Sequence, residues 1–125
     1  MNPLMRFLKS FEYAWRGIVY TVTTQPNFRR HIVVALIAVL AGWYYHLSLT
    51  EWCLVLLSIG TVWTAELVNT AIEHLTDIVS PDYNQLIGKV KDIAAGAVLF
   101  AAIAAAVVGL LIFVPHILEQ VATYQ

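Results

Sequence analysis

The chain has 125 residues, of which 60% are hydrophobic and only 12% are charged. This length fits one small domain, but a mean hydropathy of +0.74 excludes the polar surface of an ordinary soluble protein. The net charge is −1, and we expect no nucleic-acid partner. The single cysteine, Cys53, excludes an internal disulfide and is predicted to be an inert apolar side chain.

The first predicted element is a surface helix over about residues 3–24. Its apolar side chains recur at helical spacing, and charged side chains lie between them. The segment has no unbroken apolar core and no small-residue cleavage site, so it does not have the pattern of a signal peptide. We therefore expect an amphipathic helix that lies in the membrane interface. Its apolar residues are Leu4, Phe7, Leu8, Phe11, Trp15 and Ile18, and its charged residues are Arg6, Lys9, Glu12 and Arg16.

Three apolar runs follow, over residues 32–49, 52–72 and 93–114. Each is close to the roughly 20 residues that a helix needs to cross a bilayer. We predict transmembrane helices over about 29–46, 50–79 and 83–114, in an all-α membrane protein with a single domain over residues 1–125. The alternative is a soluble bundle, but its helices would need polar outer faces, which these runs lack.

Local signals give expectations for the last of these helices. Ser80 is predicted to be its N-cap, with Pro81 just after it, and Pro115 is compatible with an end at the outer interface. Small residues recur every four positions, which favours close packing of another helix. An alanine-rich membrane helix with no such role is the alternative. The small residues are Ala97, Ala101, Ala105 and Gly109.

The positive charges are distributed unevenly along the chain. They precede the first apolar run or lie between the second and third, while the segment over 46–51 and the end after Val114 contain no Lys or Arg. The positive-inside rule then places the amino terminus and the 77–91 loop in the cytoplasm. We therefore expect a multi-pass membrane protein with its amino terminus in the cytoplasm. The basic residues are Arg6, Lys9, Arg16, Arg29, Arg30, Lys89 and Lys91.

The stretch ELVNTAIEHLTD carries polar groups where the second apolar run ends. At about 100° per residue, its four polar residues fall within about 80° of one another on one helix face. A carboxylate facing lipid is unfavourable by several kcal/mol, so such groups normally face protein, a partner or an ion. A solvated helix end explains Asp77 and Glu73, but it explains Glu66 poorly. The four residues are Glu66, Asn69, Glu73 and Asp77.

Lys91 and Asp92 lie at the cytoplasmic start of the third span, at the same predicted depth as these acidic groups. Carboxylates for Mg²⁺, a cation for phosphate oxygens and a base for a hydroxyl proton are what phosphoryl transfer uses. In the alternative, Lys91 is a membrane anchor and Asp92 a carboxylate near a helix start. The chain has neither GxxxxGK[ST] nor GxGxxG, so a nucleotide site must be non-standard. The four histidines lack zinc-ligand spacing, and we interpret all of them as interface or surface residues.

Four segments together resemble the prokaryotic membrane diacylglycerol kinases and undecaprenol kinases, over nearly the whole chain. They are SFEYAWRGI, NFRRH, ELVNTAIEHLTD and KDIAAGAV. The resemblance implies an ATP- and Mg²⁺-dependent kinase that phosphorylates the primary hydroxyl of a membrane lipid. It also implies a homotrimer of three-helix subunits, each with an amphipathic surface helix. The sequences LTEW and NTAIE look closer to the undecaprenol kinase branch. They do not decide whether the substrate is diacylglycerol or undecaprenol.

The resemblance also implies roles for individual residues. Glu66 matches the general base, and Glu73 matches a metal ligand. Lys91 matches a residue that contacts the phosphates, and Asp77 matches a supporting position. The nucleotide site is implied to include Tyr13, Arg16, Asn69, Glu73, Lys91 and Asp92.

Gln25 departs from the family's pattern, because members often have a glutamate at this position as a second metal-binding carboxylate. An amide oxygen can still ligate Mg²⁺, although it brings no charge. Either the metal site is weaker or differently built, or Gln25 acts through water. Our hypothesis is that Gln25 still lies beside the metal.

A second hypothesis is a non-catalytic membrane subunit or an ion-translocating bundle, in which the acidic residues line a pathway. Failure of nucleotide to bind, with ion flux that depends on Glu66 and Glu73, would favour it. Lys91 and Asp92 favour the kinase, because a cation pathway gains little from a lysine at its mouth.

Overall fold

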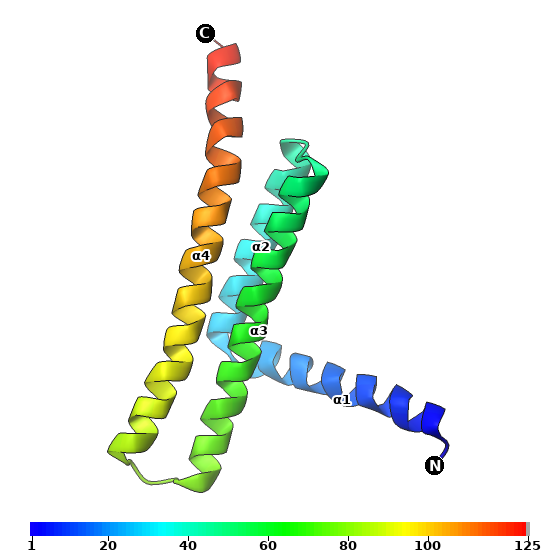
Figure 1. Cartoon of the computed structure of the whole chain (residues 1–125), viewed down its shortest axis with the longest axis vertical. Coiled ribbons are helices and arrows are strands. Elements are labelled where there is room, and N and C mark those ends of the chain that lie inside the picture. Colours follow the sequence, from blue (N-terminus) through cyan, green and yellow to red (C-terminus); the bar gives the residue numbers. More distant parts are fainter. Residues whose placement is uncertain (125) are drawn as a thin grey trace.

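The computed structural model describes residues 1–124 and consists there of helices joined by short turns (Figure 1). The connections at residues 45–48 and 80–84 lie at opposite ends of a helical bundle. The connection at residue 25 is the point where the first helix leaves the bundle. The helices are α1 (Pro3–Thr24), α2 (Pro26–Tyr44), α3 (Leu49–Val79) and α4 (Gln85–Thr123).

Helix α1 points sideways out of the bundle, with the amino terminus far from the other helices (Figure 1). Its start is fixed by the Asn2 side chain, which accepts a hydrogen bond from the Leu4 N–H at 3.1 Å, and by Pro3 in the first turn. Its end is fixed by Pro26, which begins α2. The predicted bounds of 3–24 are confirmed. Only Thr21 of this helix is buried, and most of its apolar side chains are exposed within the described chain.

A tight turn joins α2 to α3. Ser48 and Glu51 form a capping box at the start of α3, in which each side chain satisfies the backbone N–H of the other residue. Gly42 lies against the Trp52 side chain so closely that a Cβ at this position would be 2.7 Å from the indole ring. The lack of a side chain at Gly42 therefore lets the two helices approach each other beside the turn.

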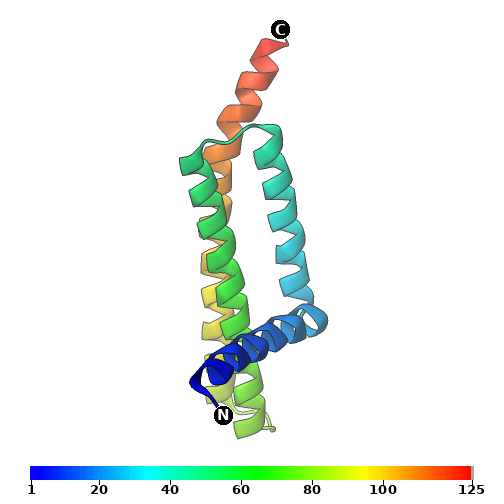
Figure 2. The ribbon, with the colours of Figure 1, turned by 90° about the vertical axis from the view of Figure 1, so that its right-hand side faces the viewer.

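Helices α3 and α4 form the most extensive pair in the molecule, whereas α2 stands away from much of this pair (Figure 2). Of the predicted small-residue positions of α4, Ala101 is buried and Ala97 is exposed, while Ala94, outside that pattern, is buried as well. Few large side chains are fully buried, and Phe28 is the largest. Many apolar side chains face outward instead, among them Phe100 and Leu57, which are 77% and 69% exposed.

Two predictions about α4 are wrong. Its N-cap is Asn84, which accepts from the Leu86 N–H at 2.8 Å, because the Ser80 hydroxyl donates to the Asp82 carbonyl instead. The helix also continues through Pro115 to Thr123. Two contacts to the α2–α3 end of the bundle hold this extension: His116 with Glu51 at 3.0 Å, and the Gln120 amide donating to the Tyr44 hydroxyl at 2.6 Å.

Helices α3 and α4 are long and apolar enough to cross a membrane. Helix α2 is shorter, and it begins with the polar sequence PNFRRH before its apolar part. From Ile32 to Tyr44, that apolar part spans about 20 Å, against a hydrocarbon thickness of about 30 Å. Length and composition thus support two of the three expected spans directly.

Candidate active site

Glu66 is the most deeply buried carboxylate in the described part of the chain, with its side chain 5% exposed. Its Oε1 lies 3.1 Å from Nε2 of His31, which comes from the first turns of α2. The Phe28 and Trp63 rings pack beside this contact with centroids 5.9 Å apart, which fixes the start of α2 against α3. Because an isolated buried charge is strongly unfavourable, the contact with His31 stabilises a charged Glu66.

One turn further along α3, the Asn69 amide donates to Oε1 of Glu73 at 3.2 Å. The carbonyl oxygen of the same Asn69 side chain is buried and has no hydrogen-bond partner in the described chain. Such an oxygen is uncommon in a folded protein, since desolvation without a bond is unfavourable by about 1–3 kcal/mol. Glu73 therefore offers a carboxylate on this turn of α3, beside a buried Asn69 oxygen that has no hydrogen bond within the described chain.

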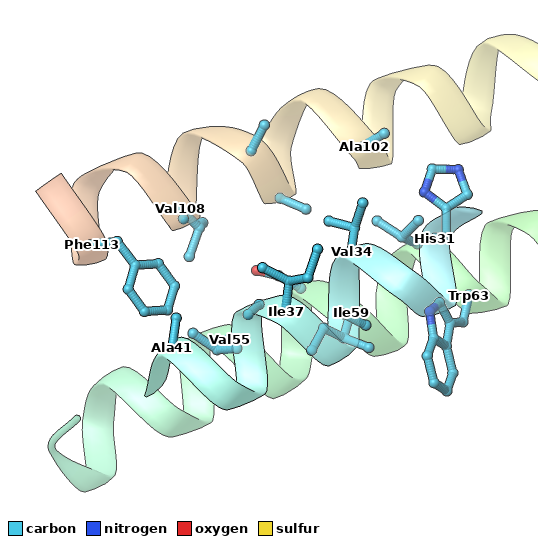
Figure 3. A pocket seen from close by; sticks show the side chains of 17 residues that line it. His31, Val34, Ile37, Ala41, Val55, Ile59, Trp63, Ala102, Val108 and Phe113 are labelled. Atoms are coloured by element: carbon cyan, nitrogen blue, oxygen red, sulfur yellow. The ribbon is translucent and has the colours of Figure 1, made fainter. Parts of the chain in front are cut away.

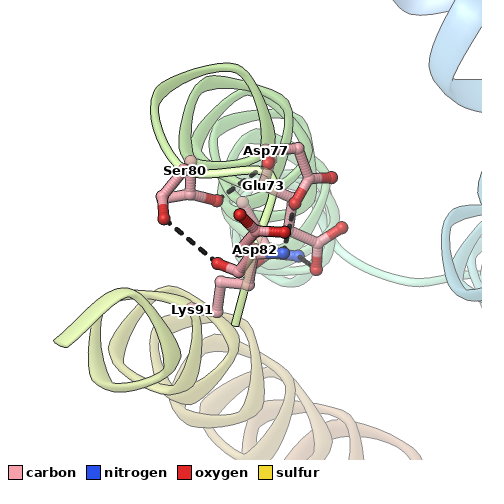
Figure 4. Close-up of polar contacts among 7 residues, drawn as sticks. Glu73, Asp77, Ser80, Asp82 and Lys91 are labelled. Atoms are coloured by element: carbon pink, nitrogen blue, oxygen red, sulfur yellow. Dashed lines mark hydrogen bonds and ion pairs between the residues drawn. The ribbon is translucent and has the colours of Figure 1, made fainter. Parts of the chain in front are cut away.

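At the far end of α3, Asp77 forms an ion pair with Lys91 of α4, with 2.5 Å between Oδ1 and Nζ. Figure 4 shows Glu73 and Asp77 on α3, with Lys91 reaching across from α4. The Asp77 side chain is 62% exposed, so the pair lies at the edge of the bundle and contributes little to stability. Asp92, the neighbour of Lys91, is exposed to solvent.

The structure does not bring every predicted site residue to α3. Tyr13 and Arg16 lie on the exposed part of α1, where Arg16 pairs with Glu12 and its guanidinium lies 6.0 Å from the Tyr13 ring centre. Helix α1 meets α3 near its own carboxyl end, where the rings of Tyr20 and His74 are 5.4 Å apart.

Gln25 lies in the junction between α1 and α2. Its backbone N–H donates to the Thr21 carbonyl at 2.8 Å, and its side chain makes no capping hydrogen bond. Within residues 1–124, no side-chain hydrogen bond joins Gln25 to Glu73, whose partner is Asn69.

The side chains on this part of α3 can be compared with those that usually bind Mg²⁺. Within residues 1–124, no three His, Cys, Asp or Glu side chains gather into a metal-binding group. Mg²⁺, however, is usually held by one or two carboxylates, with waters and substrate phosphates completing its shell. The Glu73 carboxylate and the unpaired Asn69 carbonyl oxygen fit this incomplete kind of site.

An apolar cavity of about 550 Å³ lies between α2, α3 and α4. His31 and Trp63 lie at one end of it and Phe113 at the other (Figure 3). Apart from His31, Ser58 and Trp63, the side chains around it have no polar atoms. The cavity is therefore an apolar space, and one of the residues in its wall, His31, contacts Glu66.

Sequence reasoning missed the partner of Glu66. His31 and His116 are expected to be interface or surface residues, yet both are half-buried and each pairs with a glutamate of α3. The prediction considered only zinc-ligand spacing and so did not include these two pairs, whereas His46 and His74 are exposed. A buried carboxylate requires a partner, and His31 at the start of the preceding span was the available signal.

Comparison with known proteins reveals clear relatives. The family described as "Prokaryotic diacylglycerol kinase" matches residues 12–113. The undecaprenol kinase of Bacillus subtilis is 42% identical over 116 residues, which cover 93% of this chain and 94% of that protein. The diacylglycerol kinase of Synechocystis is 41% identical over 90% of this chain and 65% of its own length. The diacylglycerol kinase of Escherichia coli K12 is 29% identical over 89% and 91%.

The family match spans most of the chain, including the buried Glu66, the Asn69–Glu73 pair and Lys91. The Bacillus subtilis relative independently covers nearly the whole of both proteins at 42% identity. The chain therefore belongs to the prokaryotic diacylglycerol kinase family and is a lipid kinase.

Proposed function

We propose that the chain transfers the γ-phosphoryl group of ATP to the primary hydroxyl of a membrane lipid, at the cytoplasmic face of the bacterial inner membrane. The observation that carries this proposal is the position of Glu66. Its buried carboxylate pairs with His31 at the end of an apolar cavity, while the polar cluster of Glu73, Asp77 and Lys91 lies further along α3. Glu66 and Glu73 are seven residues apart, or about 10 Å along the helix.

The proposed reaction needs one proton acceptor. Glu66 takes the proton of the lipid hydroxyl as that oxygen forms a bond to the γ-phosphorus. The bond between the γ-phosphorus and its bridging oxygen breaks with its electrons, so that ADP leaves and the lipid becomes a phosphate monoester. Glu66 contacts His31 of the cavity wall and lies before the polar cluster on α3, so a lipid in the cavity and a nucleotide at the cluster would approach it from two sides.

The residues beyond Glu66 are proposed to hold the nucleotide. Glu73 and the Asn69 carbonyl oxygen would hold Mg²⁺, which neutralises charge on the phosphates when bound. Lys91 would contact phosphate oxygens, with Asp77 keeping its ammonium in place through their ion pair. Asp92 is proposed to border the nucleotide beside Lys91.

Helix α1 and its junction with α2 are proposed to complete the site. Tyr13 and Arg16 would contact the nucleotide, although α1 carries them away from α3 within one chain (Figure 1). Gln25 is proposed to lie beside the metal or to act on it through water. The contact between Tyr20 and His74 supports this placement, because it joins α1 to the turn of α3 that carries Glu73.

The proposed arrangement has three spans, formed by α2, α3 and α4, with α1 in the membrane interface and residues 1–125 acting as one domain. The distribution of Lys and Arg supports a cytoplasmic amino terminus. We propose a homotrimer, because one chain leaves the polar face of α3 partly uncovered: Glu73 is half-buried and Asp77 is exposed.

The choice of lipid is open between diacylglycerol and undecaprenol. The relative at 42% identity is named an undecaprenol kinase and the relative at 41% a diacylglycerol kinase. Two such similar identities do not decide between the two lipids. An apolar cavity tolerates different hydrocarbon chains by nature.

A competition assay tests the proposal. Purified protein would receive ATP labelled in the γ-phosphate, Mg²⁺, and micelles that contain both lipids in equal amounts. We expect label in at least one lipid phosphate, separated by thin-layer chromatography, and loss of the label when EDTA removes Mg²⁺. No label in either lipid, together with ion flux into liposomes that depends on Glu66 and Glu73, would replace the kinase with an ion-translocating bundle.

A further inference from the structure

We propose that His31 is a positioning residue, which holds the Glu66 carboxylate in the orientation needed to accept the proton of the lipid hydroxyl. This inference rests on the proposed function. His31 lies in the first turns of α2 and acts through Glu66. Most residues proposed on α3 and α4 act directly on the lipid hydroxyl, the metal or the nucleotide.

The first step of the argument is that His31 supplies the only polar side-chain contact of Glu66 in the part of the chain that the structure describes. The Glu66 side chain is 5% exposed, so water replaces this contact poorly. Without His31, the buried carboxylate would turn toward a more polar region or lose its charge, and either change removes an oriented base. The contact therefore decides where the carboxylate points.

The second step concerns the two oxygen atoms of Glu66. His31 engages Oε1 at 3.1 Å, which leaves Oε2 without a side-chain partner in the described chain. At this distance the imidazole nitrogen and Oε1 are in polar contact, which favours one rotation of the carboxylate. One oxygen then fixes the rotation of the group, and the other is free to take the hydroxyl proton.

The third step is the place of His31 in the cavity. Its imidazole forms part of the wall at the end that lies beside Glu66, opposite the end at Phe113 (Figure 3). Phe28 and Trp63 hold the start of α2 against α3 at this level. A lipid that lies in the cavity with its hydroxyl toward the polar cluster would thus approach a carboxylate whose direction His31 has already set.

The test compares two substitutions of His31. His31→Leu keeps apolar bulk but removes the polar ring nitrogen that contacts Glu66, whereas His31→Gln keeps a polar group at the end of a side chain of similar reach. We expect His31→Leu to lower kcat for lipid phosphorylation by about 100-fold, the scale of a misplaced catalytic group, with the KM for ATP unchanged. We expect His31→Gln to recover most of the lost kcat.

The chain offers a matched control in His116, which pairs with Glu51 at 3.0 Å and is 24% exposed, close to the 26% of His31. His116→Leu removes an equivalent pair from the other end of the bundle, and we expect it to leave kcat at the wild-type value. A folded His31→Leu protein with wild-type kcat would overturn the positioning role. Equal losses in His31→Leu and His31→Gln, at equal thermal stability, would overturn it as well.

A second readout does not depend on activity. In the ¹⁵N NMR spectrum of histidine-labelled protein in micelles, we expect the Nε2 signal of His31 to shift when Glu66 is replaced in Glu66→Gln. The signal of His116 should stay in place. An unshifted His31 signal would overturn the contact itself, even where His31→Leu does not fold. Absence of lipid phosphorylation by the wild-type protein, with the NMR shift present, would instead reject the proposed function.

Discussion

At the scale of single residues, two glutamates of α3 each pair with a histidine, but one has a structural role and the other a proposed catalytic role. Glu51 pairs with His116 at 3.0 Å, but it is 28% exposed and also completes the capping box with Ser48. Helix capping accounts for its presence. Glu66 pairs with His31 at 3.1 Å, is 5% exposed and caps nothing. Burial of a carboxylate is unfavourable, and for Glu66 no helix cap compensates for that free energy. This favours a chemical role for Glu66.

Gln25 allows a prediction at this scale. Its side chain takes no part in capping α2, so Gln25→Glu should fold normally while it adds a carboxylate at the α1–α2 junction. If Gln25 lies beside the metal, an added charge worth about 1 kcal/mol lowers the Mg²⁺ concentration for half-maximal activity by a factor of about five. A titration of activity against Mg²⁺ measures this.

Gln85→Glu is the matched control, because it makes the same change at the exposed start of α4. We expect its Mg²⁺ dependence to equal that of the wild type. An unchanged Mg²⁺ dependence in Gln25→Glu would remove Gln25 from the metal site.

At the scale of helices, local chemistry predicted some boundaries and not others. The start of α1 at Pro3 and the end of α3 at Val79 were predictable, because proline, capping residues and apolar periodicity act within a few residues. The end of α4 was not predictable in this way. Its last turns are held by contacts of His116 and Gln120 with residues far away in the sequence, and these contacts override Pro115.

Gly42 gives a prediction for the contact between α2 and α3. A Cβ at this position would lie 2.7 Å from the Trp52 ring, and a rigid indole must move to accept it. We expect Gly42→Ala to lower the free energy of unfolding by about 1–3 kcal/mol, which is the usual range for overpacking. Thermal unfolding in detergent, followed by circular dichroism, measures the change.

Gly60→Ala is the control for this substitution. Gly60 lies within α3, and an added Cβ there would meet no neighbouring atom within 4 Å, so alanine adds helix propensity without a clash. We expect stability to rise by about 0.5–1 kcal/mol. A rise in both variants would show that Gly42 does not limit the approach of α2 to α3.

At the scale of the whole molecule, the chain has a thin core and an extensive apolar exterior. Composition predicted this exterior, and helical periodicity predicted that Glu66, Asn69, Glu73 and Asp77 share one face. Periodicity on α3 could not predict that Glu66 meets α2 while Asp77 meets α4, because these contacts depend on how the helices pack. The same limit explains why the pairing of His31 was missed.

The central claim is that Glu66 accepts the proton of the lipid hydroxyl, and the most direct measurement is the rate of phosphate transfer to lipid by purified Glu66→Gln. The amide keeps the size of the side chain but cannot take the proton, so we predict a loss of about 10²–10⁴-fold in kcat, the usual contribution of a general base. Glu51→Gln, which retains a residue suited to the capping box, should keep the wild-type rate. A folded Glu66→Gln protein that phosphorylates lipid at the wild-type rate would contradict the account.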